Sequence, residues 1–224
     1  MNKTIQIALD GPSGAGKSTL AKALARELGF IYIDTGAMYR TIALYMHRQN
    51  IDIDQPEAVI AELERVRVSI RYLNGEQRVY LGEEDVSGAI RENIISQVAS
   101  KVSAIPQVRS SLLALQRNMA AENNVIMDGR DIGTVILPDA QVKFFLTADA
   151  EVRAHRRWLE LTQKGQQVNE EDILREIKER DWRDEHREVA PAVAAEDTIP
   201  LNGNQEFDAI LAEALHIIRS KTGV

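Results

Sequence analysis

Short apolar runs alternate along this chain with longer segments in which apolar residues recur every three or four positions. The runs at 5–9 and 30–33 predict buried β-strands. Between them, Leu20 and Leu24 lie on one apolar face of an expected helix, which Gly29 ends. The chain therefore begins with the order strand, helix, strand.

The same alternation returns in the second half of the chain. Strands are expected at 125–127 and 142–146, with a weaker candidate at 198–201, and helical patterns separate most of them. Short, nearly continuous apolar strands joined by helices are typical of a parallel sheet with both faces covered. We therefore expect an α/β fold.

One stretch departs from this alternation. Residues 66–70 alternate between apolar and polar, Asn74-Gly75 is a strong signal for a hairpin turn, and 79–81 returns as a second strand. The pattern predicts a small antiparallel insertion at about 60–90. A loop at 50–56 is expected before it.

Two helices are expected after residue 150, and the second changes character along one face. The first spans 151–163, and Asn169 can cap the second. On the second helix an apolar stripe from Ile173 and Ile177 gives way to charged residues at the same spacing. Such a face would close over an anion, and an exposed ladder of ion pairs is the alternative. The charged residues are Arg180, Asp184 and Arg187.

Composition narrows the class of protein. The 224 residues include 27 Lys and Arg against 34 Asp and Glu, and this net charge of −7 argues against a general nucleic-acid binder. The absence of cysteine excludes disulfides, thiolate metal sites and cysteine nucleophiles. No apolar run approaches the roughly 18 residues of a membrane span, and the N-terminus lacks a secretory pattern. We therefore expect a cytoplasmic protein.

The most specific motif is Gly11-Pro12-Ser13-Gly14-Ala15-Gly16-Lys17-Ser18, which fits G-x-x-x-x-G-K-[ST] between a strand and a helix. The glycines allow backbone N–H groups to turn toward a phosphate, and the helix begins with its positive end beside it. Lys17 adds charge near the β- and γ-phosphates, and the Ser18 hydroxyl can ligate Mg²⁺. A chance glycine-rich turn is the alternative, which the flanking elements disfavour.

Polar residues also follow two of the expected strands at their carboxyl ends, where ligands collect in an open α/β sheet. Thr35 can hydrogen-bond a base or phosphate, and Arg40 can grip a phosphate with two bonds. Equally, Asp34 or Thr35 could cap a helix and leave Arg40 solvated. At 128–131 two carboxylates beside an arginine could order that arginine or a hydrated Mg²⁺, or could close a turn by a salt bridge.

Five segments, spread in order over nearly the whole chain, share one resemblance. They are 10–18, 34–40, 84–87, 128–134 and 179–184, and they read DGPSGAGKS, DTGAMYR, EDVS, DGRDIGT and ERDWRD. Together they resemble the bacterial cytidylate (CMP) kinases, which are nucleoside monophosphate kinases. The hairpin insertion matches too, since these kinases carry an enlarged CMP-binding domain at this place.

The resemblance implies a P-loop NTPase-type five-stranded parallel sheet flanked by helices, with a small antiparallel β insertion in the CMP-binding domain and a helical lid. The single kinase unit would divide into a core at about 1–37, 107–150 and 190–224, a CMP-binding domain at about 38–106 and a lid at about 151–189. The expected activity is transfer of the γ-phosphoryl group of Mg·ATP to CMP or dCMP in pyrimidine nucleotide metabolism. The implied cofactor is Mg²⁺, and we expect a monomer without nucleic-acid or membrane partners.

The resemblance also implies roles for individual residues. Ser100 would reach the cytosine ring, Arg109 would bind near it, and Ser18 would be the metal ligand. ATP would be bound by Gly11, Pro12, Ser13, Gly14, Ala15, Gly16, Lys17, Ser18 and Thr19. Catalysis would depend on Lys17, Arg157, Arg180 and Arg187. CMP would be bound by Thr35, Tyr39, Arg40, Ser100, Arg109, Arg130, Asp131, Arg180, Asp184 and Arg187.

Other functions stay open at this point. Another small-molecule P-loop kinase, with UMP or a shikimate-like acceptor, is the nearest alternative, although a hydroxyl acceptor would need a general base. A GTP switch usually needs an Asn-Lys-x-Asp run, and the one Asn-Lys pair is Asn2-Lys3. Trp158 and Trp182 are expected to be packing residues rather than platforms for a base.

Overall fold

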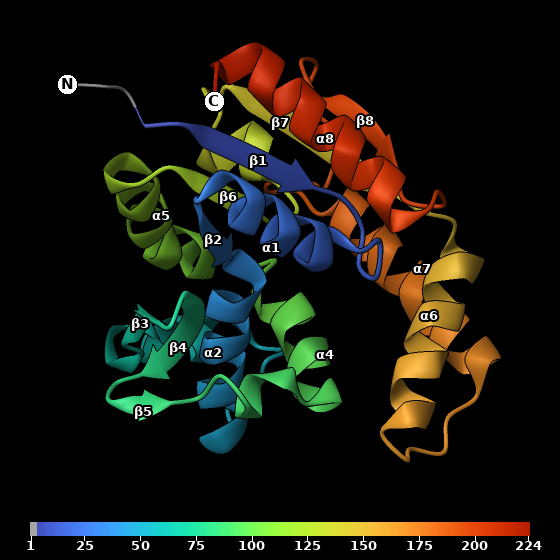
Figure 1. The fold of residues 1–224 in the computed structure, drawn as a ribbon. Coiled ribbons are helices and arrows are strands. Elements are labelled where there is room, and N and C mark those ends of the chain that lie inside the picture. The colour runs from blue at the N-terminus through green and yellow to red at the C-terminus, as the bar shows by residue number, and fades with distance from the viewer. Residues whose placement is uncertain (1–3) are drawn as a thin grey trace. The chain divides into compact units, whose positions relative to one another are not determined.

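The computed structural model describes residues 4–224. The chain forms two compact units, the first made of residues 4–32 together with 123–224 and the second of 33–122 (Figure 1). The strands are β1 (Gln6–Asp10), β2 (Ile31–Asp34), β3 (Val68–Leu73), β4 (Glu76–Leu81), β5 (Glu84–Asp85), β6 (Val125–Asp128), β7 (Val142–Thr147) and β8 (Ile199–Asn202). The helices are α1 (Lys17–Leu28), α2 (Thr35–Arg48), α3 (Pro56–Glu62), α4 (Asn93–Val102), α5 (Pro106–Glu122), α6 (Ala150–Gln163), α7 (Glu170–His186) and α8 (Phe207–Thr222), with short turns η1 (Leu63–Arg65), η2 (Ala89–Arg91) and η3 (Ile132–Ile136).

A five-stranded sheet with the order β2-β6-β1-β7-β8 forms the centre of the first unit. The central strand β1 pairs in parallel with β6, where Gln6 faces Val125, and with β7, where Ile7 faces Val142. The expected parallel sheet flanked by helices is confirmed. Its strands lie where the apolar runs predict them, because buried parallel strands are apolar on both faces.

The core of the first unit forms where α1 and α8 pack on this sheet and contact each other (Figure 1). Leu20 and Leu24 of α1 are fully buried, as the spacing of apolar residues predicts, and Ile218 of α8 packs in the same cluster. Phe144 of β7 is the largest fully buried side chain. This packing fixes the carboxyl end of β1 and the start of α1, between which the glycine-rich motif lies.

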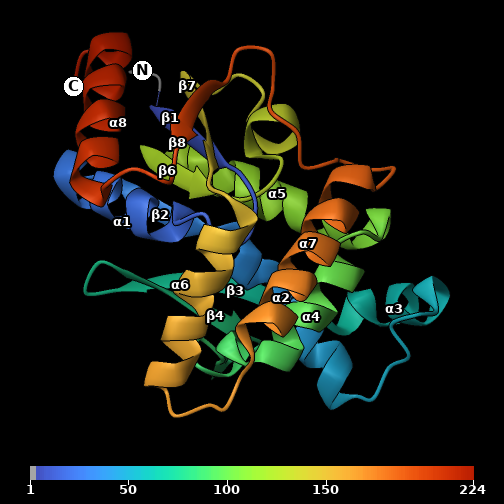
Figure 2. The ribbon, with the colours of Figure 1, turned by 90° about the vertical axis from the view of Figure 1, so that its right-hand side faces the viewer.

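Helices α6 and α7 lie side by side in the first unit (Figure 2). Ala154 and Leu161 of α6 and Ile173 and Ile177 of α7 form a small apolar cluster. The Asn169 side chain caps α7 by accepting hydrogen bonds from its first backbone N–H groups. Both predicted helices and the predicted cap are therefore confirmed.

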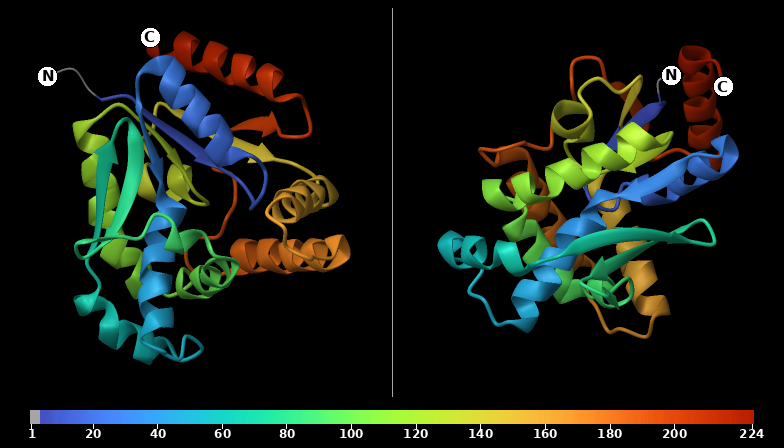
Figure 3. Two further views of the ribbon diagram at one scale, coloured as in Figure 1. Left: turned by 60° about the horizontal axis from the view of Figure 1, so that its bottom comes forward. Right: turned by 90° about the vertical axis from the view of Figure 1, so that its left-hand side faces the viewer.

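In the second unit, α2 lies between the β3–β4 hairpin and α4 (Figure 3). The hairpin closes where Leu73 pairs with Glu76, and Asn74 and Gly75 both have positive φ, at 53° and 80°. The predicted antiparallel insertion is confirmed. A short third strand, β5, was not predicted, because two residues are too few to show an alternating pattern. Within residues 4–224, no helix combines the length and apolar character that crossing a membrane requires.

Candidate functional site

The glycine-rich motif forms a tight loop from the end of β1 to the start of α1. Gly11 has a φ of 141°, and a Cβ atom built there would lie 2.0 Å from the carbonyl oxygen of Leu146. Only glycine allows this close approach of the loop to β7. Gly16, with a φ of 97°, precedes the first turn of α1, so the helix N-terminus faces the loop. The motif thus has the strand and helix context of a phosphate-binding loop.

Lys17 occupies a buried, electropositive position in the first turn of α1. Its Nζ donates a hydrogen bond to the carbonyl oxygen of Pro12, 2.7 Å away across the loop. Burial, followed by the nearby charge of Arg130, lowers the pKa of Lys17 well below its ordinary value, although Asp128 and Asp10 oppose this. A phosphate in the loop would add further negative charge beside this ammonium group and would favour its charged form.

A hydroxyl and a carboxylate suited to Mg²⁺ meet beside Lys17. The Ser18 hydroxyl donates to Oδ2 of Asp128 at 2.7 Å, and the Tyr32 hydroxyl lies 3.3 Å from the same oxygen. Asp128 is buried at the end of β6. No group of three or more His, Cys, Asp or Glu within residues 4–224 could hold a metal ion. The pair fits Mg²⁺, which binds through one or two protein ligands together with substrate phosphates.

Charged residues of α7 and of the segment after β6 meet around Asp184. Nε of Arg130 donates to Oδ2 of Asp184 at 3.1 Å, and Nε of Arg180 lies 3.8 Å from the same atom. Burial alone would raise the pKa of Asp184, but Arg130, Arg180 and Arg187 outweigh burial and lower it. The carboxylate therefore stays ionised and holds the arginines in place.

Arg187, the residue after α7, joins the same group of charges. Its Nη2 atom lies 3.6 Å from Oδ1 of the buried Asp131, and its Nε donates to the carbonyl oxygen of Ala190. The charges of Arg130 and Arg180 also act on Lys17. The first unit thus brings together the predicted residues Lys17, Ser18, Arg130, Asp131, Arg180, Asp184 and Arg187.

Arg157 has a different environment. Its guanidinium pairs with Glu160 at 2.7 Å on the same helix, α6, and both side chains are partly exposed. This contact is an ordinary ion pair between residues one turn apart. A role of Arg157 in catalysis stays a prediction.

Asp10, at the end of β1, has a position that spacing alone does not reveal. Its two oxygens accept hydrogen bonds from the backbone N–H groups of Ile132 and Gly133, each at 2.8 Å. Burial raises the pKa of Asp10 to about 6, although these two N–H groups oppose the change. Asp10 therefore fixes the start of η3, next to Asp131.

In the second unit, Asp34 anchors the start of α2. It accepts a hydrogen bond from the Ala37 N–H at 2.8 Å and pairs with Arg40 at 3.0 Å and with Arg91 at 3.1 Å. The Gln77 side chain pairs with the backbone N–H and carbonyl of Asp34. The capping alternative is therefore right for Asp34. Arg40 is not solvated, because its side chain is only 17% exposed.

The other predicted residues of the second unit are buried polar groups. Thr35 and Tyr39 lie in the first turns of α2, and the Arg109 guanidinium lies 5.5 Å from the centre of the Tyr39 ring. Arg109 also donates to the carbonyl oxygen of Ser103 at 3.2 Å. The pattern alone places Ser100 at the surface, which is wrong. Ser100 is buried in α4, and its Oγ has no hydrogen-bond partner within residues 4–224.

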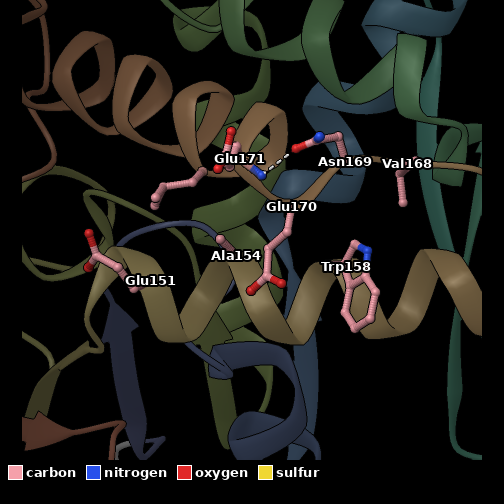
Figure 4. A pocket seen from close by; sticks show the side chains of 8 residues that line it. Glu151, Ala154, Trp158, Val168, Asn169, Glu170 and Glu171 are labelled. Carbon is pink, nitrogen blue, oxygen red and sulfur yellow. Dashed lines mark hydrogen bonds between the residues drawn. The ribbon is translucent and has the colours of Figure 1, made fainter.

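A separate pocket lies between α6 and α7 (Figure 4). Trp158 lines it together with several carboxylates, and none of its lining residues is a predicted site residue. Its acidic character does not suit a phosphate.

The prediction that Trp182 is a packing residue is wrong, because the Trp182 side chain is 62% exposed and stacks on His186. It points away from the face of α7 that carries Ile177.

Asp34→Asn is expected to lower the free energy of unfolding at pH 7 by about 2 to 3 kcal/mol, since it leaves two arginines without their carboxylate. Arg40 and Arg91 outweigh burial and lower the pKa of Asp34. The stabilisation is therefore complete above about pH 4, the ordinary range of an aspartate, and is lost as the pH falls through the lowered value. Urea unfolding between pH 7 and pH 3 measures both effects.

The matched control is Asp54→Asn, which removes an exposed ion pair with Lys101, 2.7 Å long, from the same unit. Its cost should stay below about 1 kcal/mol. Equal losses for the two variants, or a Asp34→Asn variant that is as acid-sensitive as the wild type, would contradict the anchoring role of Asp34.

Comparison with known proteins gives a consistent result. The family profile described as cytidylate kinase matches residues 7–220. Cytidylate kinase of Caldanaerobacter subterraneus subsp. tengcongensis is 54% identical over 223 residues, which are 99% of this chain and 98% of that protein. Cytidylate kinase of Caldicellulosiruptor saccharolyticus is 47% identical over 222 residues, with the same two shares.

A solved structure shares the fold. An uncharacterised protein from Eubacterium ventriosum superposes with a TM-score of 0.52 at 14% identity, and the match covers 97% of this chain and 99% of that one. At this identity the likeness concerns the fold alone. The sequence matches, in contrast, extend over nearly the full length of both proteins. The chain belongs to the cytidylate kinase family.

Proposed function

We propose that this protein transfers the γ-phosphoryl group of Mg·ATP to CMP or dCMP, giving ADP and CDP or dCDP. The observation that carries the proposal is the convergence of Lys17 with Arg130 and Arg180 beside a phosphate-binding loop. Membership of the cytidylate kinase family supports CMP as the acceptor. It also disfavours the alternative acceptors, UMP or a shikimate-like alcohol.

The chemistry requires positioning and charge rather than a general base. The acceptor is a phosphate oxygen that is already anionic at neutral pH, so no proton has to be removed before it attacks. The obstacle is the repulsion between two anionic groups brought into line. Lys17 would neutralise charge on the donor phosphates, and Arg130, Arg180 and Arg187 would do so where the two groups meet.

Ser18 and Asp128 are the residues proposed to hold Mg²⁺. The short hydrogen bond between them brings a hydroxyl and a carboxylate oxygen to one point next to the phosphate loop. When bound, Mg²⁺ supplies positive charge to the β- and γ-phosphate oxygens. Asp128 also orients the Ser18 hydroxyl, and this does not depend on the metal.

Recognition of CMP is proposed for buried polar groups of the second unit. The Ser100 hydroxyl is buried without a hydrogen-bond partner within residues 4–224, which suits an atom that meets a ligand. Arg109 is held by Tyr39 and Ser103, so its guanidinium has a fixed direction in the second unit. Thr35 and Arg40, at the start of α2, would contact the acceptor as well.

We also propose that α6 and α7 act as a lid at about 151–189. The arginines at the end of α7 would reach the phosphates, and closure would exclude water and so prevent wasteful hydrolysis of ATP. The proposed CMP-binding domain is about 38–106, and the core is about 1–37, 107–150 and 190–224. The monomeric state rests on the family resemblance, the cytoplasmic location rests on composition, and both are predictions.

A panel of acceptors tests the proposed function. ADP release with Mg·ATP is expected to be fast with CMP and dCMP, weak with UMP, and absent with AMP, GMP and shikimate. The ratio of the CMP and dCMP rates then reports how the site treats the ribose 2′-hydroxyl. ADP release with CMP no faster than that of a Lys17→Ala variant would refute the acceptor assignment.

A further inference from the structure

We infer that Arg153, a buried residue of α6, is a positioning residue that ties α7 to the phosphate-binding loop. The inference rests on the proposed function, because it gives this arginine a task in the same reaction. The sequence pattern places Arg153 among several arginines of one helix and assigns it no contact with a nucleotide. Its surroundings in the first unit distinguish it from the others.

The Arg153 guanidinium makes three contacts with three different parts of the first unit. Its Nε donates to the carbonyl oxygen of Ala148 at 2.8 Å, just before α6. Its Nη1 donates to the carbonyl oxygen of Ser13 at 3.0 Å, inside the phosphate-binding loop. Its Nη2 pairs with Oδ2 of Asp181 on α7 at 2.7 Å, and the Arg153 side chain is only 6% exposed. One side chain thus holds the loop, the start of α6 and α7 together.

The contact with Ser13 bears directly on phosphate binding. In a planar trans peptide the carbonyl and the following N–H point in opposite directions. By holding the Ser13 carbonyl, Arg153 therefore also fixes the direction of the Gly14 N–H, one of the donors of the loop. Packing reinforces this, because a Cβ atom built on Gly14 would lie 3.3 Å from Cβ of Arg153.

The contact with Asp181 bears on the arginines of α7. Asp181 is next to Arg180 in the chain, and its side chain is only 15% exposed. An ion pair at this depth, supported by further hydrogen bonds, sets the rotation of the helix more firmly than an exposed pair would. Arg153 therefore holds the loop and the α7 arginines in a fixed position relative to each other. A small displacement of either would slow phosphoryl transfer.

Two substitutions separate the two connections. Arg153→Gln removes both, so the Kd for ATP, measured by calorimetry without CMP, is expected to rise about tenfold and kcat to fall about 10- to 100-fold. Asp181→Asn removes only the connection to α7, so kcat should fall about tenfold while the Kd for ATP stays within about twofold. The double variant should be no slower than Arg153→Gln alone, because both changes break one linkage.

Arg156→Gln is the matched control. Arg156 is an exposed arginine of the same helix with one hydrogen bond to a backbone carbonyl, that of Gly203, at 2.9 Å. It should change neither the Kd nor kcat by more than about twofold. Arg153→Lys, which keeps the charge but has no planar fork, should lie between Arg153→Gln and the wild type. It provides the same test if Arg153→Gln does not fold.

Thermal unfolding of each variant distinguishes positioning from simple support of the helix. The inference is overturned if Arg153→Gln or Arg153→Lys lowers the Tm but leaves kcat and the ATP Kd equal to those of Arg156→Gln. Additive effects of Arg153→Gln and Asp181→Asn on kcat would also overturn it. A wild type that binds ATP but makes no CDP would refute the proposed function instead, and the ATP Kd would still test the loop contact.

Discussion

Lys17→Ala is expected to lower kcat for CMP phosphorylation by about a thousandfold or more. The Lys17 ammonium lies at the glycine-rich loop, and in the proposed function it neutralises charge on the donor phosphates. Alanine removes that charge together with the hydrogen bond from Lys17 to the Pro12 carbonyl. Steady-state kinetics with Mg·ATP and CMP, together with the ATP Kd, measure the loss and divide it between binding and chemistry.

Lys17→Ala should not lower the thermal stability of the protein, although it lowers kcat. Burial and the Arg130 charge lower the pKa of Lys17. The charged Lys17 side chain is therefore less stable in the folded protein than in water. Removing the ammonium should therefore leave the Tm unchanged or raise it. Lys22→Ala is the control, since Lys22 is an exposed residue of the same helix above the Tyr32 ring. A Lys17→Ala variant that loses Tm and keeps its turnover would show a structural role.

Arg187→Ala and Arg180→Ala are each expected to lower kcat by about a thousandfold, the usual effect of an arginine that stabilises charge in phosphoryl transfer. Both side chains are already held near acidic partners, Asp131 and Asp184, so little conformational freedom has to be lost in the reaction. Arg187→Lys should recover only part of the rate, because an ammonium group cannot make two parallel bonds. Single-turnover rates at saturating ATP and CMP measure these effects.

Arg183→Ala is the control for both variants, since Arg183 is an exposed residue of α7, which carries Arg180 and ends just before Arg187. Its kcat should stay within about twofold of the wild type. If it fell as far as that of Arg187→Ala, the charge of α7 as a whole would matter rather than the two named side chains. Unfolding of either variant near room temperature, with full turnover by the folded fraction, would indicate a structural role instead.

Much of the fold could be predicted from local patterns. β1 and β7 are buried apolar runs, Leu20 and Leu24 mark the inner face of α1, and Asn74-Gly75 marks the hairpin. These predictions are correct because each depends on residues that are close together in the chain. The strand order β2-β6-β1-β7-β8 has no such signal and follows from the family resemblance.

The residues of the site could be predicted less well from local sequence patterns. Arg130 and Asp184 are 54 residues apart, and no local pattern shows that they meet. Ser100 looks like a surface residue because small polar residues are common on exposed helix faces, yet it is buried. Arg153 belongs to a helix with several arginines, and only the three-dimensional contacts separate it from its exposed neighbours.

The position of β1 in the sheet has a consequence for how the protein is made. Gln6 pairs with Val125, and the backbone N–H of Ile5 donates a hydrogen bond to the Asn124 side chain, which lies 119 residues further along the chain. At about 5–20 residues per second, the ribosome needs about 6 to 24 s to produce that partner. All of residues 33–122 leave the ribosome in this interval, while the apolar strand containing Ile7 and Leu9 has no sheet to join. Until β6 is made, the apolar strand β1 is therefore exposed to aggregation and would benefit from a chaperone.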